Sequence, residues 1–167
     1  MKKQDQMISL AYYKFISELI NSSSYDRSST QNRIYHIGDS HCLSIAHQLL
    51  SIGNTSYQVE PLPTFGAKAF HFSTKKNNKH KAITDMNLKS IPRNSKVFLS
   101  FGEIDCRPNE GFIHAANKKN HALSQLISTT VSHYVNWIYQ KNERCGHDLY
   151  FFNVPAPMYN KNFSDTV

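Results

Sequence analysis

The 167-residue sequence has no run of apolar residues that approaches the ~18 needed to cross a membrane. Its basic N-terminal stretch also lacks the apolar segment and small-residue cleavage site of a signal peptide. It has only three cysteines, Cys42, Cys106 and Cys145, so they cannot all pair with one another. These absences exclude a membrane-spanning protein and predict a cytoplasmic protein with reduced thiols.

Charged residues are also few, at 19% of the chain, whereas 40% is hydrophobic and there are 10 Phe and 9 Tyr. This composition excludes a disordered chain, which has few aromatics and much charge. The length is sufficient for one domain with a proper core.

The formal net charge is +7, and much of the excess lies in the basic run 75–81. Such a run predicts a solvated surface loop, with an anion-attracting patch as the alternative. The sequence has no zinc-finger spacing, RNP-like strand or obvious recognition helix, so we expect no nucleic-acid partner.

The sequence predicts two parts, residues 1–32 and 33–167. Apolar residues recur at helical spacing over 5–20, and a polar linker follows that helix to residue 32. The helix is expected to pack against the second part, with a dimer contact as the alternative.

Residues 33–167 alternate between strand and helix patterns, which predicts an α/β fold with a parallel sheet. The strands are expected at 33–37, 57–62, 97–101 and 149–154. The helices are expected at 43–50, 85–88 and 117–141.

Polar clusters follow two of these strands. The first is Gly38-Asp39-Ser40-His41, and the second runs from Gly102 to Arg107. Parallel strands bring both clusters to one edge of the sheet, where open α/β sheets bind ligands. Ser40, at a strand-to-helix turn, is a candidate nucleophile whose N–H can stabilise an oxyanion. Alternatively, Asp39 or Ser40 merely caps the following helix.

Ile37-Gly38-Asp39-Ser40 resembles the first motif of the SGNH (GDSL-type) hydrolases, which are serine esterases, lipases and carbohydrate O-acyl hydrolases, some of them acyltransferases. The resemblance implies a three-layer α/β/α, flavodoxin-like domain that needs no cofactor. It also implies that Ser40 is the nucleophile, that Gly66 supplies an oxyanion N–H, and that Gly102-Glu103-Ile104-Asp105 is the third motif. Asp39, Gly102 and Asp105 then belong to the catalytic set.

The chain departs from the SGNH pattern at two places. Ile104 stands where the family has the asparagine of the oxyanion hole. The Asp-x-x-His that supplies the general base is absent, so the resemblance implies a domain that is incomplete at its C-terminus. His41, His71 and His114 are the substitute bases that we consider, whereas a structural role is expected for His36.

A second resemblance uses the same residues. The segment from Arg33 to His41, with Asp39 and His41 as Asp-x-His, resembles the opening motif of calcineurin-like metallophosphoesterases. That reading implies Asp39, His41 and Glu103 as metal ligands, whereas the SGNH reading implies no metal. The expected Gly-Asn-His-Glu motif has only 119–122 as a counterpart. A third reading is a non-catalytic glycan-binding or truncated SGNH-like domain.

Two interpretations are open for Glu103, Arg107 and Cys106 of the second cluster. Glu103 and Arg107, four residues apart, either form an ion pair or contribute to substrate binding together with His41. Arg107 would then hold an anionic group or orient Asp105. Cys106 is expected to be a buried thiol rather than a nucleophile. The expected substrate is a small or carbohydrate ester.

Overall fold

A computed structural model describes residues 16, 32–119 and 122–152. The chain divides into two units, Met1–Gln31 and Asn32–Val167, and the fold below belongs to the second. Apart from Ile16, the predicted N-terminal helix lies outside the described residues, and so do positions 153 and 154 of the last predicted strand.

The sequence expectation of an α/β fold is confirmed. The sheet has five strands in the order β2-β3-β1-β4-β5, of which β3, β1, β4 and β5 are parallel and β2 is antiparallel to β3. The strands are β1 (Asn32–Gly38), β2 (Leu49–Ile52), β3 (Thr55–Pro63), β4 (Lys96–Ser100) and β5 (Asp148–Phe151).

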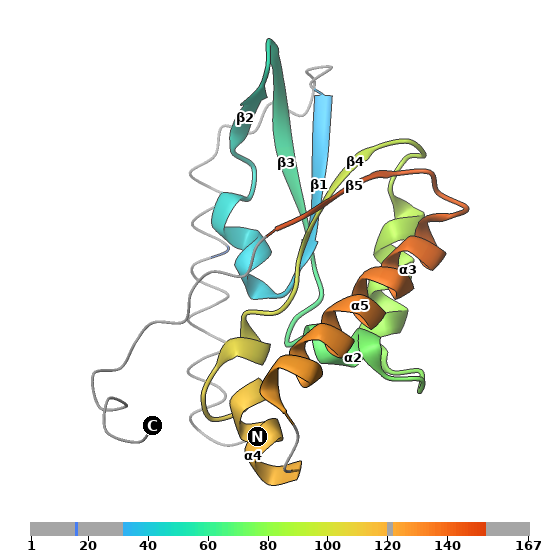
Figure 1. The fold of residues 1–167 in the computed structure, drawn as a ribbon. Helices are drawn as coiled ribbons and strands as arrows, with labels where there is room; N and C mark the ends of the chain where they lie inside the picture. The colour runs from blue at the N-terminus through green and yellow to red at the C-terminus, as the bar shows by residue number, and fades with distance from the viewer. Residues whose placement is uncertain (1–15, 17–31, 120–121, 153–167) are drawn as a thin grey trace. The chain divides into compact units, whose positions relative to one another are not determined.

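Helices flank this sheet. In Figure 1, α2, α3 and α5 lie on one side of the strands, and the short cyan helix η1 lies on the other. The helices are η1 (Ser40–Ile45), α2 (Ala69–Ser73), α3 (Lys79–Ser90), η2 (Ile104–Cys106), α4 (Phe112–Lys119) and α5 (Leu123–Asn142). Within the described ranges, none of them combines the length and apolar character needed to cross a bilayer.

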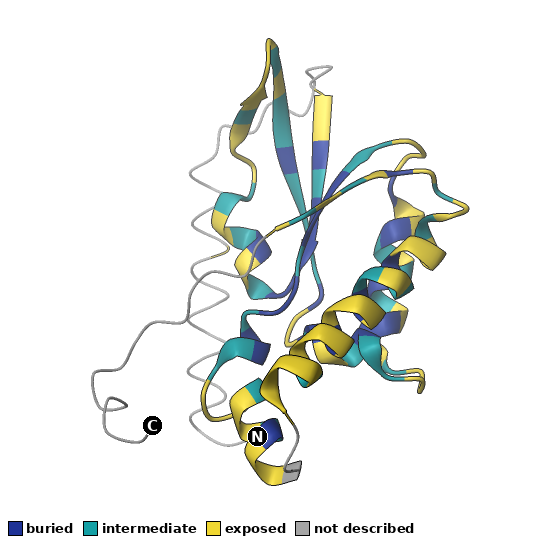
Figure 2. Cartoon of the chain, viewed as in Figure 1, coloured by how far each residue is buried: buried dark blue, intermediate teal, exposed yellow. Residues whose placement is uncertain are grey.

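The main core lies between the sheet and α2, α3 and α5. Ile37 of β1 and Leu99 of β4 meet Leu88 of α3 and Ile138 of α5 there, and all four side chains are almost fully buried. Burying such side chains contributes ~1.5–3 kcal/mol each. Figure 2 accordingly shows dark blue on β1 and β4 and yellow on the outer surface of α5.

The predicted helix over 43–50 is wrong. The chain instead forms the short 3₁₀ helix η1, which ends at Ile45, and then continues into β2, where Leu50 pairs with Tyr57 of β3. Gly53 takes a φ of 60° in the turn between the two strands, a conformation that glycine adopts without steric cost. The apolar residues that resemble a helical stripe are therefore divided between a helical turn and an edge strand.

The other helices also differ from the expectation. The predicted helix over 117–141 is two helices, α4 and α5, and the short one expected at 85–88 is part of α3. α3 begins at Lys79, inside the basic run that was expected to be a loop. Lys81 is buried there with its Nζ 5.7 Å from the centre of the Trp137 ring, whereas Lys75 and Lys76 are exposed in the preceding loop.

Candidate functional site

Three segments meet at the C-terminal edge of the parallel strands. The N–H of Asp39, after β1, donates to the carbonyl of Ser100 at the end of β4 over 3.3 Å. The N–H of Thr64, after β3, donates to the carbonyl of Gly38 over 2.7 Å. The polar clusters that follow β1 and β4 are therefore neighbours, as the parallel-sheet reading predicts.

Gly38 allows β1 and β4 to approach closely at this edge. A Cβ at this position would lie 2.2 Å from Ser100 Oγ and 2.8 Å from the Ser100 carbonyl oxygen. Its φ lies outside the left-handed region, so absence of a side chain, rather than an unusual turn conformation, is what the position requires. The motif glycine thus has a packing role.

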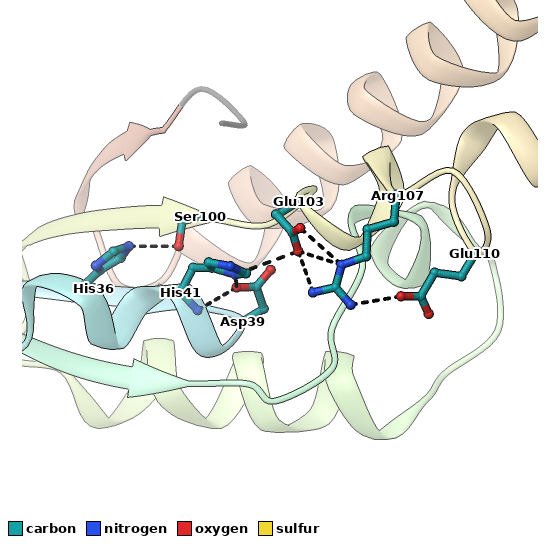
Figure 3. Close-up of polar contacts among 7 residues, drawn as sticks. All are labelled: His36, Asp39, His41, Ser100, Glu103, Arg107 and Glu110. Carbon is teal, nitrogen blue, oxygen red and sulfur yellow. Dashed lines mark hydrogen bonds and ion pairs between the residues drawn. The ribbon is translucent and has the colours of Figure 1, made fainter. Parts of the chain in front are cut away.

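Asp39 is the N-cap of η1, and only 1% of its surface is exposed. Its Oδ1 accepts the backbone N–H of His41 over 2.9 Å and lies 2.8 Å from the Nδ1 of the same residue (Figure 3). The capping alternative is therefore confirmed for Asp39. Ser40, half-buried, is the first residue of η1, and His41 directs Nδ1 toward Asp39 rather than toward the Ser40 hydroxyl.

The expected ion pair between Glu103 and Arg107 is present. Arg107 Nη2 lies 2.8 Å from Glu103 Oε2, and Arg107 Nε lies 3.1 Å from each carboxylate oxygen. Glu110 accepts from Nη1 over 2.9 Å, and these hydrogen bonds, first those to Glu103, raise the pKa of Arg107 above its usual range. In Figure 3 the guanidinium lies between the carboxylates of Glu103 and Glu110.

Asp39, His41 and Glu103 form a compact cluster, with one possible ligand atom from each residue lying within 4.8 Å of the others. These are the three residues that the metallophosphoesterase reading implies as ligands. The partial counterpart of that family's next motif includes Asn120 and His121, which lie outside the described residues.

Asp105 has a structural environment. It is 2% exposed, and its two oxygens accept the N–H groups of Ala69 over 2.7 Å and Phe70 over 3.2 Å. Burial raises its pKa, opposed by these hydrogen bonds. The backbone of Asp105 also touches Gly111, where a Cβ would lie 2.0 Å from the Asp105 carbonyl oxygen.

The oxyanion residues that the resemblance implies have distinct surroundings. Gly66 is exposed in the loop after β3 with a φ of 69°, and Gly102 is buried after β4 with a φ of 129°. Ile104 is 8% exposed, so its side chain packs inside and offers no donor.

The other candidate bases lie in different surroundings. His71 accepts the N–H of Lys68 at Nδ1 over 2.9 Å and stacks on His80, and burial lowers its pKa to about 4. His114 is exposed on α4. His36 is buried in β1, with Nε2 2.8 Å from Ser100 Oγ, which confirms its expected structural role. Of the three candidates, His41 is the one that contacts Asp39.

The cysteines of the chain are unpaired, and two of them lie near the candidate site, Cys42 in η1 and Cys106 in η2. All three cysteines are free, as expected. Burial raises the pKa of Cys42 to about 12 and raises that of Cys106, which keeps both as neutral thiols.

Sequence reasoning missed two participants. Ser100 contacts both Gly38 and His36. Its position as the last residue of a buried strand could have predicted that it lies at the site. Glu110 shares Arg107 with Glu103, and its spacing of three residues from Arg107 was the available signal.

Comparisons of the chain with protein-family models, curated proteins and solved structures found no significant match.

Proposed function

We propose that this chain is an SGNH-type hydrolase-like protein, a serine esterase or O-acyltransferase for carbohydrate or other small esters. Ser40 is its nucleophile, and the domain has the flavodoxin-like α/β/α architecture of that family. A cytoplasmic location belongs to the same proposal, and the three free thiols are compatible with it.

The observation that carries the proposal is the position of Ser40. It begins η1 directly after β1, where the segments after β3 and β4 are hydrogen-bonded to Gly38 and Asp39. The parallel strands run in the order β3-β1-β4-β5, so the chain moves outward in opposite directions from β1. The edge between β1 and β4 is the kind of switch point at which α/β sheets bind ligands.

The proposed reaction is acyl transfer. Ser40 Oγ attacks the ester carbonyl carbon, its proton passes to a base, and the C–O bond to the alcohol breaks as the alcohol leaves with a proton. Water or an acceptor hydroxyl then takes the acyl group from Ser40. The N–H groups of Ser40 and Gly66 hold the oxyanion, and Ile104 contributes nothing to it.

Two exposed aromatic rings support a carbohydrate as the substrate. Phe65 lies next to Gly66 in the loop after β3, Phe70 is the second residue of α2, and they are 55% and 42% exposed. Flat apolar ring faces next to a polar site suit the faces of a sugar ring.

Ester hydrolysis tests this proposal. The rate with p-nitrophenyl acetate and with a peracetylated sugar is compared among the unchanged protein, Ser40→Ala and Ser44→Ala. Ser44 lies exposed in the same short helix, so it is the matched control. The proposal predicts a loss of at least about 100-fold in Ser40→Ala and none in Ser44→Ala. Equal rates in all three proteins would overturn it.

A further inference from the structure

We propose that Asp39, His41 and Glu103 bind one divalent transition-metal ion, Mn²⁺ or Zn²⁺. This inference does not depend on the nucleophilic role of Ser40. It starts from the convergence of two carboxylates and one imidazole, each offering an atom within 4.8 Å of the others. Their elements are distant in sequence, since Asp39 and His41 follow β1 and Glu103 follows β4.

A second observation is the free oxygen of Asp39. The residue is 1% exposed, and Oδ2 has no hydrogen-bond partner within the described part of the chain. Figure 3 shows that this oxygen lies on the side of Asp39 that faces Glu103. A buried carboxylate oxygen without a partner is costly, and a cation bound there would satisfy it.

The charges of the cluster also favour a cation. Asp39 and Glu103 carry one negative charge each, and the nearby guanidinium of Arg107 is shared between Glu103 and Glu110. Asp39, Glu103 and Glu110 contribute three carboxylates and Arg107 one guanidinium, so the acidic groups outnumber the basic ones around the buried Asp39. A divalent ion would supply the missing positive charge between the two strand ends.

The distances are close to those of a metal centre. Ligand atoms that share one ion at ~2.0–2.2 Å lie roughly 3–3.5 Å apart. His41 Nδ1 is already 2.8 Å from Asp39 Oδ1 and 3.9 Å from Glu103 Oε2. The three ligand atoms lie within 4.8 Å of one another, so the widest pair must close by up to about 1 Å to share one ion. His41 is 48% exposed, which leaves its side chain room for that movement.

Arg107 orients the third ligand without removing it. Its guanidinium donates one hydrogen bond to Oε1 and two to Oε2 of Glu103. A carboxylate has about four lone-pair sites, so one site is left for a metal ion. Neutral imidazole suits Zn²⁺, and carboxylate oxygen suits Mn²⁺, so this mixed set selects those ions over soft Cu(I). Three protein ligands leave positions open for water or a substrate oxygen.

The test is direct metal binding by the full chain. Mn²⁺ binding is followed by the electron paramagnetic resonance signal of the free ion, and Zn²⁺ binding by calorimetry. Glu103→Gln and His41→Gln change ligands whose side chains are 22% and 48% exposed, so we expect them to disturb the fold less than Asp39→Asn, which changes a buried carboxylate. Glu110→Gln is the matched control, because it removes the other carboxylate on Arg107 without touching the cluster.

We expect one ion per chain, with affinity at least about tenfold weaker in Glu103→Gln and His41→Gln and within about twofold in Glu110→Gln. Ser40→Ala should bind the ion as well as the unchanged protein does, so failure of the nucleophile and failure of the metal site are separable. No saturable binding of Mn²⁺ or Zn²⁺, or binding whose affinity is unchanged by both ligand substitutions, would overturn the proposal.

Discussion

Asp105 Oδ2, which follows β4, lies 2.7 Å from the backbone nitrogen of Ala69, the first residue of α2. This hydrogen bond joins the segment after β4 to the segment that follows β3. Gly66 is in the second of these segments, so the position of the proposed oxyanion donor depends on a buried carboxylate that does not touch Ser40 in the structure. If Gly66 is the oxyanion donor, Asp105 is a positioning residue for it.

Replacing Asp105 with Asn should lower the free energy of unfolding by about 1–3 kcal/mol. The amide keeps one acceptor oxygen, so it can serve Ala69 or Phe70 but not both. Urea denaturation at neutral pH measures the loss. Asp148→Asn is the control, because Asp148 is 64% exposed and pairs only weakly with Lys96 at 3.5 Å. Equal stability of the two variants would contradict the positioning role.

A methyl group at position 38 should disrupt the site edge. Gly38→Ala would bring Cβ to 2.2 Å from Ser100 Oγ and 2.8 Å from backbone, so β1 and β4 must separate. We expect a loss of about 3 kcal/mol or more, or failure to fold. Gly53→Ala has open space but a φ of 60°, so it should cost only about 1 kcal/mol. Thermal unfolding that ranks the two variants in reverse would refute this packing role.

Acid should destabilise the fold through His36. Burial lowers the pKa of His36 to about 4, whereas the unfolded chain titrates near 6.5. Between these values the unfolded state binds more protons, so the stability that is present above pH 6.5 is lost as the pH falls through 4. The full loss is up to about 3 kcal/mol.

His36→Gln measures this contribution, because glutamine can keep a hydrogen bond to Ser100 but does not titrate. Urea unfolding between pH 7 and pH 4 should show a shallower decline in the variant than in the unchanged protein. Parallel curves for the two proteins would mean that other groups cause the acid sensitivity.

The Arg107 network should contribute little to stability. Arg107 is 43% exposed and Glu110 47%, so solvent screens both of its ion pairs. Arg107→Gln should therefore change the free energy of unfolding by less than about 1 kcal/mol, and that change should shrink further in high salt. A salt-independent loss of several kcal/mol would show that the network is structural after all.

The sequence allowed prediction of the elements whose residues are buried on both sides. β4 was expected because Val97 and Leu99 belong to a near-continuous apolar run, and β1 because 33–37 is rich in strand-forming residues. The polar segments that follow them were expected at one edge of the sheet, and they are neighbours there. The prediction of a helix over 43–50 was wrong because Leu49 and Leu50 fit an amphipathic helix as well as an edge strand. Residues 49–52 form a strand because they pair with β3, and this pairing cannot be read from the local sequence.

Within the site, the sequence predicted which polar segments lie close together, but not which side chains form hydrogen bonds with one another. The pairing of Glu103 with Arg107 follows from a spacing of four residues, whereas the capping of α2 by Asp105 joins residues 36 apart. The residues next to Gly38 in the sequence do not predict its contact with Ser100, because only the pairing of β1 with β4 brings the two residues together. Long-range contacts of this kind are what the structure adds.

The nucleophilic role proposed for Ser40 can be measured directly by reaction of the full chain with a fluorophosphonate probe. If Ser40 is an activated nucleophile, the probe forms a covalent bond to its Oγ, peptide mapping finds the adduct on Ser40, and Ser40→Ala is not labelled while Ser44→Ala is. Absence of labelling in the unchanged protein, or labelling that persists in Ser40→Ala, would show that Ser40 is not an activated nucleophile.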